Sequence, residues 1–358
     1  MQSETVNEKW TTHNFIHENA LKILMNDLGE KSYFGNLDGN AITKVNKVLE
    51  SLLDKKEVFQ NYANFPDEKE RDYSFEVKKY NKNGIQVKRI RWPIPAFSNH
   101  FFSPHQAASY TYKIFNDIYK LIPSGLKEFF NDFRNQGIFY NAMKLFLLHT
   151  ENAINNYYRD GNVSEDVIKE LSKACHYIED MNQTHHVTNN IAFFSNHKKF
   201  EQYANLNKDL FTISSAKEFC RINSLKPGEK QFWGKYNFYL KFINIDYLIN
   251  RSGIDALMQA CSWIGVYSSC FATGVDDLYS NNINEGLEHV SLYCGDDDVK
   301  NVLISKNWER ASWALSNDKE KWQLNIEQTL KMAQISVASY IFIFFLYIAE
   351  PNIFSYQT

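Results

Sequence analysis

HYIEDMNQTHHVTNNIAFFSNHKKFEQ, residues 176–202, holds most of the chemically informative side chains of this 358-residue chain. His176 and Asp180 are four residues apart, and His197 and Glu201 repeat that spacing further on. In a helix, residues at this spacing share one face, about one turn apart. A single His–Asp pair on a helix is usually a surface salt bridge, whereas two such pairs close together indicate a metal site.

A fifth donor, His186, lies between the two pairs. Imidazole nitrogen and carboxylate oxygen are common protein donors to zinc, so this cluster of donors predicts a zinc site. His185 stands next to His186 and has the same chemistry, so chemistry alone does not separate the two.

Composition limits the classes of protein to which the chain can belong. Hydrophobic residues make up 44% and charged residues 23%, which is ordinary for a globular protein. The formal net charge is -3 and no basic run occurs, which weighs against a long nucleic acid as partner. The five cysteines include no CxxC pair, which favours scattered buried thiols over a disulfide framework.

Apolar residues recur at helical spacing along most of the chain, which predicts an all-α fold. The first apolar stripe consists of Phe15, Ile16, Leu21, Leu24 and Leu28. We expect further helices at 41–62, 105–122, 141–159, 164–182, 197–210, 232–250, 253–272, 281–293, 299–316 and 318–349.

One segment has a different pattern. YSFEVKKYNKNGIQVKRIRW, residues 73–92, has two β-prone arms around Asn83-Gly84, and Asn-Gly between such arms predicts a β-hairpin. No Pro/Gly-rich linker divides the chain, so we expect a single helical domain over 1–358. Within it, the hairpin is an insertion at about 72–93, and a helical insertion follows at about 205–300.

The most apolar run is Ile335 to Ala349, flanked by Lys331 and Glu350. A helix that spans a membrane needs about 20 apolar residues, so this shorter run predicts a buried core helix and no transmembrane segment. The first ten residues lack an apolar stretch, so no signal peptide is visible. Localisation stays open between the cytoplasm and secretion, either after processing or by a non-classical route.

The pattern H-x3-D-x5-H-x10-H-x3-E over residues 176–201 resembles the core signature of the zinc-dependent phospholipases C. That family includes the clostridial alpha-toxin and the Bacillus phosphatidylcholine-preferring enzyme, and it shares an ancestral helical fold with the S1/P1 single-strand nucleases. The five-residue spacing after Asp180 selects His186 over His185. Three other segments resemble family motifs: Trp10-Thr-Thr-His13, Phe65-Pro66-Asp67 and Asn99-His100-Phe101-Phe102-Ser103-Pro104.

The resemblance implies up to three zinc ions. One ion would take His186, His197 and Glu201; a second would take Asp67, His100 and His176; and a third would take His13 and Trp10, with Asp180 bridging the last two ions. Asp67 would also lie near the attacking water and is the candidate catalytic residue. Asp72 is the nearest competitor of Asp67 in the sequence.

Trp10 is a special case because the family uses the free amine of an N-terminal tryptophan as a zinc ligand. Cleavage after Lys9 would create that amine here. Without cleavage, an amide nitrogen is a poor ligand, and Trp10 is then a core residue at a helix start.

The implied activity is a phospholipase C reaction at a membrane surface, which yields diacylglycerol and a phosphorylated head group. Its zinc would lower the pKa of a bound water towards 7. The alternative is a single-strand nuclease or nucleotidase of the S1/P1 kind, in which paired aromatic side chains would stack a base. A third alternative is a metal-binding relative without activity. No protein partner is predicted.

Overall fold

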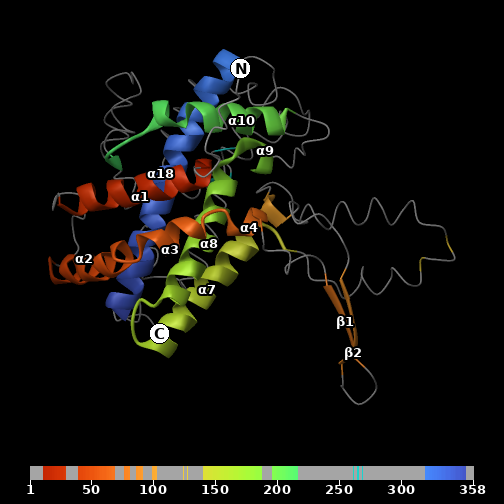
Figure 1. The fold of residues 1–358 in the computed structure, drawn as a ribbon, viewed down its shortest axis with the longest axis horizontal. Coiled ribbons are helices and arrows are strands. Elements are labelled where there is room, and N and C mark those ends of the chain that lie inside the picture. Colours follow the sequence, from red (N-terminus) through yellow and green to blue (C-terminus); the bar gives the residue numbers. More distant parts are fainter. Residues whose placement is uncertain are drawn as a thin grey trace, which may run out of the picture.

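The computed structural model describes residues 11–29, 39–68, 76–80, 86–91, 99–102, 124, 127, 140–187, 196–216, 261, 264, 265, 268 and 319–351. This part of the chain is mainly helical, which confirms the all-α class predicted from apolar periodicity. Figure 1 shows its helices gathered in one body, with two short strands lying away from them.

Helix α1, Thr12–Gly29, carries the first apolar stripe. Phe15, Ile16, Leu21, Leu24 and Leu28 are all buried, at 7% exposure or less. The helix buries polar side chains as well, among them Asn14 and His17. Its inner face packs against helices α18 (Lys319–Ala349) and α8 (Glu165–Asn182).

The last helix, α18 (Lys319–Ala349), forms the centre of the core. It packs against α1, α8 and α2 (Gly39–Leu53). Among the described residues it contains the one segment long and apolar enough to cross a membrane, Asn325–Ala349, of which the most apolar window is 89% buried inside the protein. Burial on this scale is that of a core helix, as the sequence predicted.

Helices α7 (Ala142–Asp160) and α8 (Glu165–Asn182) pair along their length. Asn141 caps α7 by accepting a hydrogen bond from the Lys144 amide at 2.8 Å. Gly161 ends it in the left-handed conformation, with φ of 67°. Ser164 then caps α8, so the turn between the helices is tight and α8 starts where its sequence predicted.

The single helix expected at 41–62 is divided into two. Helix α2 ends at Leu53, and α3 spans Lys56–Asn61. Asp54 and Lys55 turn the chain, with the Lys55 amide bonded to the Leu52 carbonyl. The turn lets α3 pack on α8, where the Ser172 hydroxyl donates to the Phe59 carbonyl at 2.7 Å.

Three shorter helices carry several of the candidate metal ligands. Helix α4 is Phe65–Glu68, α9 is Thr184–Val187, and α10 is His197–Asn207. A 3₁₀ turn, Lys208–Phe211, continues α10 to about the end expected from the sequence. Figure 1 shows α9 and α10 beyond the end of α8.

Strands β1 (Glu76–Tyr80) and β2 (Gln86–Arg91) pair antiparallel, with Glu76 opposite Arg91. They lie within the range of the expected hairpin, whose Asn83-Gly84 turn is outside the described residues. Also outside are the helices expected at 105–122, 232–250, 281–293 and 299–316. Of the helix expected at 253–272, four residues are described, and all four are helical: Cys261, Ile264, Gly265 and Ser268.

Candidate metal centre

The side chains singled out in the sequence gather around the C-terminal half of α8. His176 and Asp180 project from this helix and are 0% and 2% exposed. Helices α1, α4, α9 and α10 and residues 99–102 bring the other donors to them. Three groups result, and within each group one donor atom per residue lies within 4.8 Å of the others.

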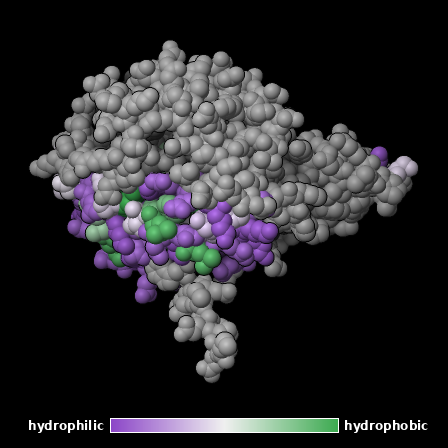
Figure 2. Space-filling model, turned by 90° about the horizontal axis from the view of Figure 1, so that it is seen from above, coloured by the Kyte–Doolittle hydropathy of each residue, from purple (hydrophilic) through white to green (hydrophobic). Residues whose placement is uncertain are grey.

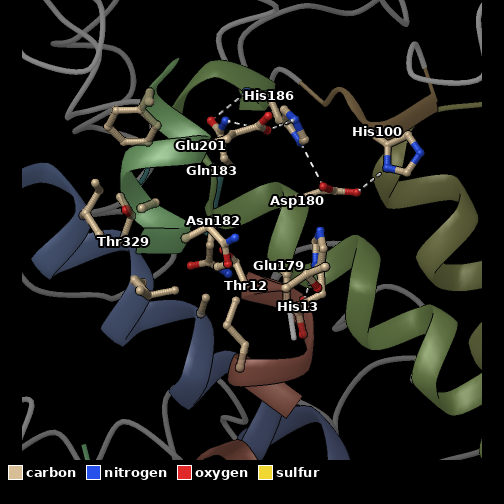
Figure 3. Close-up of a pocket in the computed structure, with 18 of the residues that line it drawn as sticks. Thr12, His13, His100, Glu179, Asp180, Asn182, Gln183, His186, Glu201 and Thr329 are labelled. Atoms are coloured by element: carbon tan, nitrogen blue, oxygen red, sulfur yellow. Dashed lines mark hydrogen bonds and ion pairs between the residues drawn. The ribbon is translucent and has the colours of Figure 1, made fainter. Parts of the chain in front are cut away.

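The first group is His186, His197 and Glu201. His186 Nε2 and His197 Nε2 are 3.1 Å apart. Glu201 Oε1 lies 2.7 Å from His197 Nε2 and 3.4 Å from His186 Nε2. Because His197 and Glu201 are four residues apart on α10, their side chains lie on the same face of the helix and contact each other. Figure 3 shows His186 and Glu201 side by side.

The second group is Asp67, His100 and His176. His100 Nδ1 and His176 Nε2 are 3.1 Å apart. Asp67 Oδ1 lies further out, 3.7 Å from His100 Nε2 and 3.8 Å from His176 Nε2. Asp67 is half-exposed at its side chain, whereas both histidines are buried.

The third group is His13, His176 and Asp180, so His176 is common to two groups. The rings of His13 and His176 stack with centroids 4.0 Å apart. His13 Nε2 lies 3.6 Å from Asp67 Oδ2, which connects the third group to the second. Trp10 lies outside the described residues, as does Asp72.

Asp180 contacts three of the histidines, and together these three belong to all of the groups. Its Oδ1 is 2.9 Å from His186 Nδ1, and its Oδ2 is 2.7 Å from His100 Nδ1 and 3.2 Å from His176 Nε2. Figure 3 shows this carboxylate between His186 and His100, with interactions to each. Burial alone would raise its pKa, but His176, His100 and His186 outweigh burial and hold the pKa of Asp180 well below its usual range.

The same pairing raises the pKa of the histidines. Burial would lower the pKa of His186, but Asp180 and Glu201 outweigh it and raise the pKa to about 10. The pKa values of His100 and His176 are raised against burial in the same way, mainly by Asp180. The pKa of Asp67 is lowered by His176, His100 and His13 despite burial. The site is therefore a dense array of coupled charges.

Glu179 was not predicted from the sequence, although it adjoins Asp180. Its side chain is 1% exposed, and its two oxygens contact His13 Nδ1 and His17 Nε2, the latter at 3.0 Å. Burial raises its pKa to about 7, against the opposing effect of His13. The spacing of His13 and His17, one turn apart on α1, was the available signal.

Three histidines outside these groups pack against other rings. His17 stacks on Phe59 with centroids 4.4 Å apart. His149 stacks on Tyr177, with an interplanar angle of 4°. His185 is fully buried and stacks on His197, with ring centroids 5.0 Å apart. His186 rather than His185 therefore joins the first group, as the five-residue spacing indicated.

All three donor sets fit zinc in kind, and the first also fits it in spacing. Bonds from zinc to nitrogen or oxygen of about 2.0–2.1 Å place tetrahedral donors roughly 3.3 Å apart, and the first group's separations of 2.7–3.4 Å bracket that value. His176 Nδ1 is bonded to the Ala63 carbonyl at 2.8 Å, which leaves Nε2 for a metal. Ligand histidines in proteins usually have such a partner on the second nitrogen.

A pocket of about 660 Å³ opens over the three groups. One side of it is polar, with Thr12, Asn182, Gln183 and Asn205 beside the donors. The other side is apolar and comes from α1, α10 and α18: Ile16, Phe200, Ala204, Ile326, Leu330 and Ala333. On the outer face seen in Figure 2, the described residues are mostly hydrophilic around small hydrophobic patches.

The fold and the site together define a mainly helical protein whose histidines and carboxylates form adjoining groups able to hold metal ions. Among solved structures, the alpha toxin from Clostridium absonum resembles it with a TM-score of 0.54 at 17% identity, over 98% of this chain and 67% of that one. The alpha-toxin of Clostridium perfringens, isolated from an avian strain, resembles it with a TM-score of 0.52 at 16% identity, over 98% of this chain and 66% of that one. The chain thus has the fold of two thirds of these toxins. No family model and no curated protein matches the sequence.

Proposed function

We propose that the chain is a zinc-dependent phospholipase C that hydrolyses the glycerol-side phosphodiester of phospholipids at a membrane surface. Two independent observations support this function. The signature over residues 176–201 resembles that of zinc-dependent phospholipases C, and the fold is similar to that of clostridial alpha toxins.

The residues proposed as zinc ligands are those of the three groups together with Trp10. His186, His197 and Glu201 would hold one ion, Asp67, His100 and His176 a second, and His13 with Trp10 a third, with Asp180 as the bridge. When bound, zinc supplies Lewis acidity towards the phosphate oxygens and lowers the pKa of a coordinated water.

The chain's own residues contribute orientation and proton transfer. Asp67 is half-exposed at the pocket wall, and its lowered pKa keeps it ionised at neutral pH. An ionised carboxylate at this place is able to orient a water, although the lowered pKa makes Asp67 a weaker proton acceptor than an ordinary aspartate. Asp180 is buried and fixes His100 and His186 through their Nδ1 atoms, which keeps the donors in place between turnovers.

The observation that favours lipid is the apolar wall of the pocket. Helix α18 contributes three apolar side chains to the pocket that the candidate metal ligands line: Ile326, Leu330 and Ala333. A diacylglycerol leaving group needs such a surface beside the phosphate, since each buried methylene contributes about 0.8 kcal/mol. A nuclease would instead need aromatic rings placed to stack bases.

A substrate panel tests the proposal. The zinc-loaded chain is offered phosphatidylcholine, phosphatidylethanolamine, sphingomyelin and single-stranded RNA, each with and without chelator. We expect chelator-sensitive release of diacylglycerol from at least one glycerophospholipid. Hydrolysis of RNA with no lipid turnover would assign the S1/P1 activity instead, and zinc uptake with no turnover of any substrate would assign an inactive relative.

A further inference from the structure

Glu179 occupies an unusual position between α8 and α1. Its side chain is buried and reaches two histidines that lie one turn apart on α1. One of them, His13, belongs to the third metal group, and the other, His17, is 0% exposed and stacks on Phe59. Figure 3 shows Glu179 and His13 in contact below Asp180.

The contact selects one ring nitrogen of His13. Glu179 Oε2 bonds to Nδ1, while Nε2 points to the other side of the ring, 3.6 Å from Asp67 Oδ2. A neutral imidazole has one protonated and one free nitrogen, so a carboxylate that accepts from Nδ1–H leaves the lone pair of Nε2 for a metal.

Glu179 is itself held by a second contact. His17 Nε2 lies 3.0 Å from Oε1. A buried carboxylate with no partner is strongly destabilising, and here His13 bonds one oxygen while the His17 ring lies against the other without forming a hydrogen bond. His13, Glu179 and His17 therefore form a chain of contacts between the metal group and the α1–α3 interface, where His17 packs on Phe59.

We propose that Glu179 is the positioning residue of the His13 metal site: it accepts a hydrogen bond from His13 Nδ1 and thereby directs Nε2 to the ion. The inference rests on the proposed zinc site. It makes the orientation of His13 depend on the packing of α1 against α8.

The first experiment compares zinc binding by the wild-type chain, Glu179→Gln and Glu170→Gln, using competition with a chromophoric chelator and metal analysis. Loss of such outer partners typically weakens metal affinity by about 10–100-fold. We expect this loss at one ion in Glu179→Gln, with the remaining ions retained. Unchanged affinity at every ion in Glu179→Gln would overturn the proposal.

Glu170 is a matched control. It lies on the same helix, bonds His149 Nδ1 at 2.7 Å through a carboxylate oxygen, and does not line the pocket. Glu170→Gln therefore removes a His–carboxylate pair of the same kind and should leave all zinc affinities unchanged. An equal loss of zinc affinity in both variants would assign the effect to general destabilisation and overturn the proposal.

The second experiment needs no variant. Two-bond ¹⁵N–¹H correlation spectra of the zinc-loaded wild-type chain distinguish the tautomers of His13. We expect a protonated Nδ1 and a metal-bound Nε2, and metal on Nδ1 would overturn the inference. If the chain takes up zinc but cleaves no phospholipid, the proposed function fails while both experiments still decide on Glu179. If it takes up no zinc, both proposals are overturned.

Discussion

At the scale of single residues, Asp180 determines how the donors are arranged. It lies within 3.2 Å of three histidine nitrogens, from His100, His176 and His186. A carboxylate can accept at about four lone-pair positions, so one side chain is able to orient donors in different groups. The groups are therefore physically coupled, so that a substitution in one group should alter the orientation of donors in another.

The first group offers the most direct test of the site. We expect His186→Ala and Glu201→Gln each to abolish phosphodiester turnover, because each removes one of three converging donors. The measurement is hydrolysis by zinc-saturated protein, with circular dichroism to verify the fold. Glu151→Gln is the control: Glu151 is exposed on α7 and does not line the pocket. Full activity in either donor variant would contradict the site assignment.

Metal binding should release protons. Asp180 and Glu201, which outweigh burial, raise the pKa of His186 to about 10, so the metal-free chain carries His186 protonated at pH 7. A histidine that binds zinc through Nε2 must lose a proton, so the apparent zinc affinity should rise as the pH rises from 6 to 8. Calorimetry in buffers of different ionisation enthalpy measures the release. Binding heats that do not depend on the buffer would contradict this prediction.

Much of the candidate site was predictable from spacing, and Glu179 shows why the rest was not. The i, i+4 pairs on α8 and α10 fix which side chains share a face, so His176 with Asp180 and His197 with Glu201 follow from sequence alone. Glu179 contacts His13 only because α1 packs on α8 at one particular rotation. That rotation depends on the whole core, and spacing within either helix does not encode it.

At the scale of elements, the α7–α8 pair is held by a charged contact at its centre. Glu170 on α8 accepts from His149 Nδ1 on α7 at 2.7 Å, and His149 is fully buried. Burial would raise the pKa of Glu170, but His149 and Lys173 outweigh it and lower the pKa to about 2. The paired carboxylate thus contributes to the stability of the pair.

The sign of this contribution gives an acid-stability prediction. Because the folded pKa of Glu170 lies below its ordinary value of 4.5, its stabilisation is full above about pH 4.5 and is lost as the pH falls towards 2, up to about 3 kcal/mol. We expect Glu170→Gln to be less stable than wild type at pH 6, with less than half of that difference left near pH 3 and little of it below pH 2. Urea unfolding of the metal-free proteins measures the difference, and a gap that stays constant with pH would refute it.

The turn between α7 and α8 depends on Gly161. Its φ of 67° is in the left-handed region, and no atom lies within 4 Å of an added Cβ, so the cost of a side chain there is conformational. We expect Gly161→Ala to destabilise the protein by about 1–2 kcal/mol. Gly39→Ala is the control, because Gly39 starts α2 with no positive φ and equal space. Equal effects of the two substitutions on denaturant midpoint would contradict the assignment.

Element boundaries were predictable where local chemistry marks them. Ser164 caps α8 where the sequence placed a helix start, and the apolar periodicity gave α7 and α18 within a residue or two. The break between α2 and α3, at Asp54 and Lys55, was missed because no glycine or proline marks it: residues 41–62 contain neither. Tertiary packing of Phe59 against His17 and α8 overrides the local helix preference there.

At the scale of the whole molecule, α18 and the candidate metal centre have complementary roles. Helix α18 buries its apolar residues against α1, α2 and α8, and its Ile326, Leu330 and Ala333 also line the pocket. The metal groups take donors from α1, α4, α8, α9 and α10 and from residues 99–102, so they join the N-terminal helix to elements in the middle of the chain. Apolar packing on α18 thus stabilises the contacts among α1, α2 and α8, and bound ions would stabilise the contacts among the elements that carry the donors.

Chelation should therefore lower global stability as well as activity. An ion present at 1,000 times its dissociation constant stabilises the folded state by about 4 kcal/mol, provided that the unfolded chain does not bind it. We expect chelator to lower the melting temperature of the zinc-loaded chain by several degrees, and a zinc-saturated chelator to leave it unchanged. His186→Ala, which lacks a donor of the first group, should show a smaller shift than wild type, whereas Glu151→Gln should show the full shift. Identical melting curves with and without free chelator would mean that ions do not join these helices in solution.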